Sequence, residues 1–127
     1  MQRLPSEQIQ TFLDFMGECK TEYAQNVTEV HKHDRQQQDH LHDLEFADNY
    51  KERCRLATKI HEERLVRRAH KDRVELVEKV AEFLADKQNK QFMDRLIALA
   101  KKQRQVEEYL NSERHYNRRG GDPDADS

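Results

Sequence analysis

The stretch that decides the fold is Ser6–Glu45, SEQIQTFLDFMGECKTEYAQNVTEVHKHDRQQQDHLHDLE. Its apolar residues recur three and four positions apart, which is the period of one face of an α-helix. They are Ile9, Phe12, Leu13, Met16, Cys19, Tyr23, Val27, Val30, Leu41 and Leu44. Pro5 suits a first helical turn and Ser6 suits an N-terminal cap. The sequence therefore predicts one long helix over about residues 6–45.

Two further helices are predicted downstream. Asn49, followed by Glu52, indicates a capping box, and no Gly or Pro interrupts residues 49–85, the predicted second helix. After the segment DKQNK at residues 86–90, a third helix is predicted over about residues 90–116. Gly120 and Gly121 end the regular structure, and residues 120–127 are expected to form a disordered acidic tail.

The composition favours long helices over a globular core. Only 35% of the chain is apolar and 38% is charged, which suits helices that each bury a narrow stripe. Gly and Pro are too scarce for a sandwich or barrel. Long helices with short connections pack antiparallel. We expect an all-α, elongated, antiparallel three-helix bundle or long helical hairpin, coiled-coil-like, formed by residues 1–119 as one domain and self-associating through its apolar stripes.

The second helix carries a basic face. Its members lie at positions i, i+3, i+4 and i+7, and they are Arg64, Arg67, Arg68 and Lys71. Like charges at this spacing weaken a helix, so something must offset the repulsion. One alternative is ion pairing with acids of the first helix, namely Glu18, Glu22 and Glu29. The other is an anionic ligand, because guanidinium groups bind phosphate through two hydrogen bonds.

The apolar residues of the second helix change face near Leu65. Before this point one face holds Tyr50, Cys54, Ala57 and His61, and after it a different face holds Leu65, Ala69, Leu76, Val77, Val80, Phe83 and Leu84. Continued at heptad spacing, the earlier line leads into the basic face. We therefore expect the basic residues between helices or at a groove, not on an open surface.

Six of the seven histidines lie between His31 and His70. A hairpin folded near residue 47 brings His33 close to His61, with His40 one heptad from His33. A metal would need His33, His40 and His61, with Asp34, to converge, but no motif such as HExxH occurs and no metal site is predicted. We favour a polar layer that fixes helix register and oligomeric state.

A second anionic contact is proposed at the C-terminal stretch, where Tyr116 can stack on a base while Arg118 and Arg119 hold phosphate. The alternative is a solvated helix end. Cys19 and Cys54 are expected to be buried free thiols. Nucleophile motifs, phosphate-binding Gly loops and paired carboxylates do not occur, so we expect no enzyme, no catalytic residues and no cofactor.

Charge and hydropathy limit the partners and the location. The net charge of −2 disfavours broad nucleic-acid binding. No stretch approaches the roughly 20 apolar residues that cross a membrane, and residues 1–17 lack the features of a secretory signal. We expect a cytoplasmic homo-oligomer without membrane association.

Three segments, GECKTEY at 17–23, DHLHDLE at 39–45 and VEEYL at 106–110, resemble a family of short helical hypothetical proteins of bacterial and prophage genomes. We associate no established activity with that family, so no site residues carry over. The resemblance implies a small helical protein of a mobile element. Such proteins often act by binding, so we expect a non-enzymatic phage or mobile-element accessory or anti-defence protein that captures an anionic partner.

That partner would be a phosphate-bearing nucleotide or the acidic surface of a defence enzyme. The first alternative is a structural or adaptor coiled coil that mediates protein–protein assembly. The second alternative is nucleic-acid binding.

Overall fold

The computed structural model describes residues 4–112, which form three helices and no strand. The helices are α1 (Pro5–Glu45), α2 (Tyr50–Ala85) and α3 (Lys87–Asn111). The all-α prediction is confirmed. The predicted end of the third helix at residue 116 and the predicted tail lie outside the described residues. No helix among residues 4–112 is long and apolar enough to cross a lipid bilayer.

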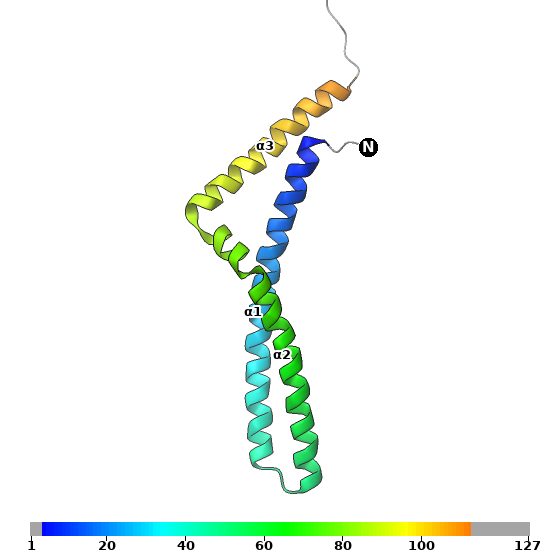
Figure 1. Ribbon diagram of the computed structural model, residues 1–127, viewed down its shortest axis with the longest axis vertical. Helices are drawn as coiled ribbons and strands as arrows, with labels where there is room; N and C mark the ends of the chain where they lie inside the picture. Colours follow the sequence, from blue (N-terminus) through cyan, green and yellow to red (C-terminus); the bar gives the residue numbers. More distant parts are fainter. Residues whose placement is uncertain (1–3, 113–127) are drawn as a thin grey trace, which may run out of the picture. The chain divides into compact units, whose positions relative to one another are not determined.

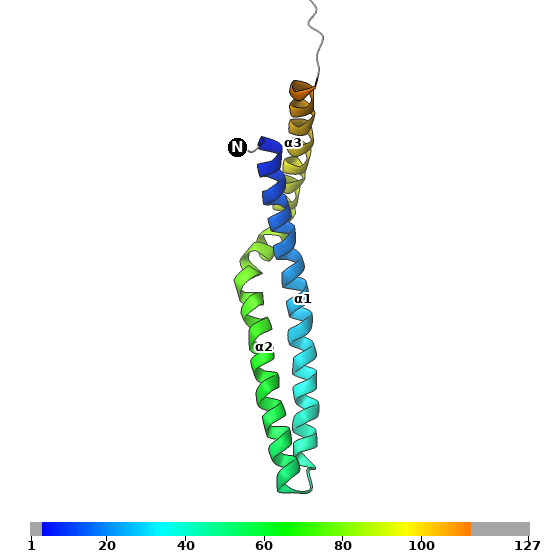
Figure 2. The same ribbon diagram turned by 90° about the vertical axis from the view of Figure 1, so that its right-hand side faces the viewer.

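Helices α1 and α2 form an antiparallel hairpin and, starting from the loop that joins them, lie side by side over most of the length of α2 in both views (Figures 1 and 2). Asn49 caps α2, because its Oδ1 accepts a hydrogen bond of 2.8 Å from the Glu52 backbone N–H. The Glu52 carboxylate does not complete the capping box; it pairs with Arg55, with 2.6 Å between Oε2 and Nη2. The predicted cap is therefore correct, and Glu52 contributes its backbone to it.

The facing positions of the hairpin, called the seam below, alternate by three and four residues along both helices. On α1 they are Met16, Cys19, Tyr23, Asn26, Val30, His33, Gln37, His40 and Leu44. On α2 they are Leu56, Ile60, Glu63, Arg67, His70, Val74, Val77, Ala81 and Leu84. All are buried or half-buried. This unbroken heptad spacing is the packing pattern of a coiled coil.

The predicted phase of α2 is wrong before residue 65. Tyr50, Cys54 and His61 are exposed, while Leu56 and Ile60 occupy the buried positions. The physical reason is that α2 carries apolar residues at helical spacing on two faces, and only one face meets α1.

Packing against α1 also buries only some of the apolar residues predicted to share a face from Leu65 onward. Val77 and Leu84 are buried, but Leu65, Leu76 and Phe83 are exposed. The two thiols divide in the same way. Cys19 lies in the seam and is buried as predicted, whereas Cys54 is exposed, against the prediction.

The start of α1 differs from the predicted Ser6 cap. The Leu4 carbonyl accepts hydrogen bonds from the backbone N–H groups of Glu7 and Gln8 at 3.0 and 3.2 Å, so the helix begins one residue before Ser6. Ser6 is buried, and its hydroxyl and its backbone N–H both donate to the carboxylate of Glu107 on α3. Ser6 therefore links two helices and does not cap one.

The contacts divide the chain into two units. One is the hairpin unit, residues 14–92. In the other, residues 4–13, which include the start of α1, pack with residues 93–112, which include most of α3. The side of α3 in this packing includes Ala100, only 1% exposed, and Arg104 donates to Gln10 at 3.4 Å. The single-domain prediction stays a prediction.

One residue separates α2 from α3. The backbone N–H of Asp86 donates to the Phe83 carbonyl at 3.3 Å. Its Oδ1 accepts hydrogen bonds from the backbone N–H groups of Gln88 and Asn89, at 2.9 and 3.3 Å. Asp86 therefore ends α2 and caps α3. The third helix begins at Lys87, earlier than predicted, because the expected linker is itself helical.

Candidate functional site

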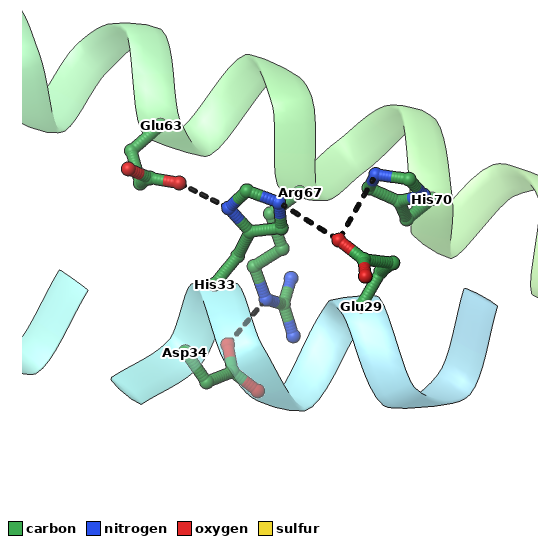
Figure 3. A network of polar contacts seen from close by, with 6 residues as sticks. All are labelled: Glu29, His33, Asp34, Glu63, Arg67 and His70. Atoms are coloured by element: carbon green, nitrogen blue, oxygen red, sulfur yellow. Dashed lines mark hydrogen bonds and ion pairs between the residues drawn. The ribbon is translucent and has the colours of Figure 1, made fainter. Parts of the chain in front are cut away.

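The centre of the seam is polar, whereas the seam positions of α2 are apolar at both ends. Figure 3 shows His33 and Glu63 in contact across the hairpin, through the Nδ1 atom of His33 and the carboxylate. His70 reaches back to α1, with 2.7 Å between its Nδ1 and the Oδ1 of Asn26. The helices are therefore joined in the middle by directional polar contacts.

The observed register differs by two residues from the predicted one. His33 lies opposite Glu63, whereas a fold near residue 47 was expected to bring it to His61, which is exposed. His40 is half-buried, and its Nδ1 is buried without a hydrogen-bond partner among residues 4–112.

Among the described residues, the group able to hold a metal ion consists of Glu29, His33 and His70. Of the residues weighed for a metal in the sequence, this group keeps His33 and leaves out His40, His61 and Asp34. Its other two members are Glu29 and His70. The signal that could have found His70 is its heptad distance from Glu63, which places both residues in the seam.

A groove of about 790 Å³ runs beside the seam, and is called the basic groove below. From α1 it is lined by Asp34, Gln37, Gln38 and Leu41, and from α2 by Arg64, Arg67, Arg68, Lys71, Asp72 and Glu75. All four residues of the predicted basic face line this one groove. They flank the seam, except for Arg67, which is a seam residue.

Ion pairing accounts for one of these four cations. Arg67 pairs with Asp34 through its Nε atom. Within residues 4–112, no carboxylate oxygen lies within 4.0 Å of a cationic nitrogen of Arg64, Arg68 or Lys71. All three of these side chains are exposed.

Two of the three acids expected to neutralise the basic face, Glu22 and Glu29, have other partners. Glu22 pairs with Arg73. Glu29 contacts His33 at 3.6 Å and His70 at 3.9 Å. Three of the four cations therefore remain free of ion pairs in the described part of the chain.

The basic groove also contains carboxylates. Four cations face three acids along its lining, which leaves an excess of one positive charge. Asp34 is engaged by Arg67, so Asp72 and Glu75 are the acids without such a partner in this lining. The groove can therefore offer cationic donors and anionic acceptors to the same ligand.

In the described part of the chain, two carboxyl groups away from the groove have a lowered pKa. The hydrogen bond from Arg55 lowers the pKa of Glu52. Burial raises the pKa of Glu107, but the hydrogen bonds from the Ser6 hydroxyl and backbone N–H together outweigh it, and the net shift is downward. The predicted C-terminal contact of Tyr116, Arg118 and Arg119 lies outside the described residues.

Comparison of the chain with protein-family models, with curated protein sequences and with solved structures finds no match. The resemblance to short helical proteins of bacterial and prophage genomes therefore stays a prediction from the sequence.

Proposed function

We propose that the protein is a non-enzymatic binding protein that captures a phosphate-bearing nucleotide in the basic groove. The observation that carries this proposal is that Arg64, Arg68 and Lys71 line the groove without a carboxylate partner among the described residues. The groove volume of about 790 Å³ falls within the usual range of small-molecule sites.

The spacing of the cations supports an anionic occupant. Arg64 and Arg68 are four residues apart, and Lys71 follows three residues later. Each such pair destabilises the helix by roughly 0.2–0.5 kcal/mol. A phosphate between them removes the repulsion and accepts two parallel hydrogen bonds from each guanidinium group. Binding of a phosphate would therefore offset the like-charge repulsion that destabilises the ligand-free helix.

The acids of the groove favour a nucleotide over inorganic phosphate or an acidic protein surface. Asp72 and Glu75 can accept hydrogen bonds from the hydroxyl groups of a ribose or the amino group of a base. An acidic protein surface would meet the same carboxylates as like charges. The phosphates of a nucleotide match the cations of the lining, and the hydrogen-bond donors of its ribose and base match the acids.

Direct nucleic-acid binding is less well supported, because the groove carries three acids and the chain has a net charge of −2. The setting stays a prediction from the sequence: a cytoplasmic accessory or anti-defence protein of a phage or mobile element. An acidic defence enzyme as the partner is likewise a prediction.

Titration of the protein into a fluorescent methylanthraniloyl-ATP, followed by anisotropy, tests the proposal. The informative variant is Arg64→Glu with Arg68→Glu. The matched control is Arg53→Glu with Lys59→Glu, which reverses two exposed charges of the same helix away from the groove. Loss of two charge-assisted contacts is expected to weaken binding by about 100-fold or more in the first variant. The control should stay within about threefold of wild type, since it removes no such contact.

Circular dichroism should show equal helicity in all three proteins, because the four substituted side chains are exposed. The proposal is wrong if the wild-type protein shows no saturable binding to methylanthraniloyl-ATP or, in the same titration, to methylanthraniloyl-GTP. It is equally wrong if both double variants lose binding to the same extent, since that pattern indicates general electrostatic attraction.

A second candidate function, assembly as a coiled coil with a second copy of the chain, rests on a separate observation. Sixteen large hydrophobic side chains are exposed in the described chain, against nine hydrophobic residues that are buried. On α2 the exposed set includes Leu65, Leu76 and Phe83, at helical spacing on the side away from the seam. Exposed apolar area of this extent favours a protein partner. Sedimentation equilibrium distinguishes the cases, because a monomer at all concentrations excludes this candidate.

A further inference from the structure

Two histidine rings and one carboxylate converge at the centre of the seam (Figure 3). The Nε2 atoms of His33 and His70 lie 3.6 and 3.9 Å from the same Oε1 atom of Glu29. One ligand atom from each residue lies within 4.8 Å of the other two. Ligand atoms around a tetrahedral Zn²⁺ are about 3.4 Å apart. Small side-chain rotations would therefore bring the three atoms to bonding distance of one ion.

The partners of the Nδ1 atoms determine which nitrogen of each ring carries the proton. On His33, Nδ1 faces the carboxylate of Glu63, which only accepts hydrogen bonds, so Nδ1 donates. On His70, Nδ1 faces the Oδ1 atom of Asn26 at 2.7 Å. The amide nitrogen of Asn26 donates to the Glu22 carbonyl at 2.8 Å, which fixes the orientation of that amide. Both neutral rings therefore present a lone pair at Nε2.

The convergence of these lone pairs favours the binding of a cation. Two Nε2 lone pairs and a carboxylate oxygen face one another, and the tautomers leave no proton donor between them. The two rings are stacked, with centroids 5.4 Å apart and an interplanar angle of 19°. A divalent metal ion placed between these atoms accepts all three lone pairs at once.

The surroundings of the two histidines match those of metal ligands. A metal-bound histidine usually donates its other N–H to a carboxylate or carbonyl oxygen, as His33 does to Glu63 and His70 to Asn26. Gln36, with its amide nitrogen turned toward Glu63, donates to Oε1 of that residue at 3.0 Å and steadies the carboxylate.

We propose that Glu29, His33 and His70 bind one divalent transition-metal ion of the Zn²⁺ type, with water completing the coordination. Two imidazole nitrogens and one carboxylate oxygen suit Zn²⁺ and Co²⁺ better than Mg²⁺ or Ca²⁺. The His33 side chain is 12% exposed and that of Glu29 is 37% exposed, so the site opens to solvent on the Glu29 side. None of the three ligands lines the basic groove, which makes this proposal independent of nucleotide capture.

Calorimetric titration of untagged, chelator-stripped protein with ZnCl₂ tests the site. Wild type is expected to bind one ion per chain, and the variant His33→Gln with His70→Gln should bind none. The matched control, His31→Gln with His61→Gln, removes two exposed histidines from the same two helices. It should retain affinity within about threefold, and Glu63→Gln should weaken binding by about 10-fold through the orientation of His33.

A second measurement uses wild-type protein alone, so its result does not depend on correct folding of the double variant. In ¹⁵N spectra of the wild-type imidazoles, ZnCl₂ should move the Nε2 signals of His33 and His70, while their Nδ1 atoms stay protonated. Absence of stoichiometric binding overturns the proposal. So does equal loss of binding in the two double variants, or a zinc-induced shift confined to other histidines.

Discussion

The ends and the centre of the seam share one heptad spacing but differ in chemistry. At one end the positions include Cys19 on α1 and Val77 on α2, and at the other Leu56 and Ile60 on α2, all buried. The centre holds residues such as His33, joined by hydrogen bonds and ion pairs. Apolar burial is non-directional, so the ends hold the helices together without specifying which residues meet.

The polar residues at the centre of the seam specify which residues of α1 and α2 meet. If α2 slipped by one heptad along α1, apolar positions would still meet apolar positions over much of the seam. The same slip would separate His33 from Glu63 and leave half-buried polar groups without partners, at about 1–3 kcal/mol each. The layer that carries the candidate metal ligands therefore also selects the register of the hairpin.

Truncation at an apolar end should have the largest effect. Leu56 is 3% exposed, so Leu56→Ala is expected to lower the free energy of unfolding by about 2–3 kcal/mol through lost burial and a residual cavity. Leu65 lies on the same helix but is 57% exposed, and Leu65→Ala should change stability by less than about 0.5 kcal/mol. Urea unfolding followed by circular dichroism measures both. A comparable loss at Leu65 would show that a second chain covers that face.

Substitution at the polar centre should have an intermediate effect that a second substitution reverses. In metal-free protein, His33→Leu leaves the half-buried Glu63 carboxylate without its partner and should cost about 1–2 kcal/mol. Adding Glu63→Leu converts the pair into apolar contact and should recover most of that loss. The same unfolding experiment gives the double-mutant cycle. Additive losses would mean that the two side chains are not energetically coupled.

The Ser6–Glu107 contact, in the other unit, should have the smallest effect and a pH dependence. Because the pKa of Glu107 is lower in the folded than in the unfolded chain, its contribution is fully present above the unfolded pKa and is lost as pH falls through the folded value. The melting temperature should therefore fall on the acid side, below about pH 4.5. Glu107→Gln should flatten part of that fall, whereas Glu108→Gln, an exposed neighbour, should not. Identical acid-side profiles for wild type and Glu107→Gln would exclude the contribution.

The bounds of α2 were predictable because their signals are local. The Asn49 cap and the absence of Gly and Pro within α2 act over a few residues, and no tertiary contact is needed to interpret them. Ser6 shows the limit of this approach. Its side chain has the chemistry of a cap, but α1 begins at Pro5, so Ser6 lies inside the first turn, and its hydroxyl donates to Glu107, which is distant in sequence.

The phase of α2 and the partner of His33 could not be predicted in the same way. Leu65 and Leu56 are equally apolar, and only packing against α1 decides which one is buried. Glu63 lies opposite His33 where His61 was predicted. This shift of two residues is set by the loop and the packing together. The four basic residues do line a groove as expected, but the proposed line from Tyr50 was wrong, because Tyr50 is exposed.

The unequal burial of the two thiols makes the opening of the hairpin observable. Cys54 is exposed on α2, so a thiol reagent reaches it while the protein stays folded. Cys19 is buried in the seam and becomes reactive only when α1 and α2 separate there. The delay between the first and the second modification therefore measures how often this apolar end of the seam opens. Both reporting thiols belong to the natural sequence, so no cysteine has to be introduced.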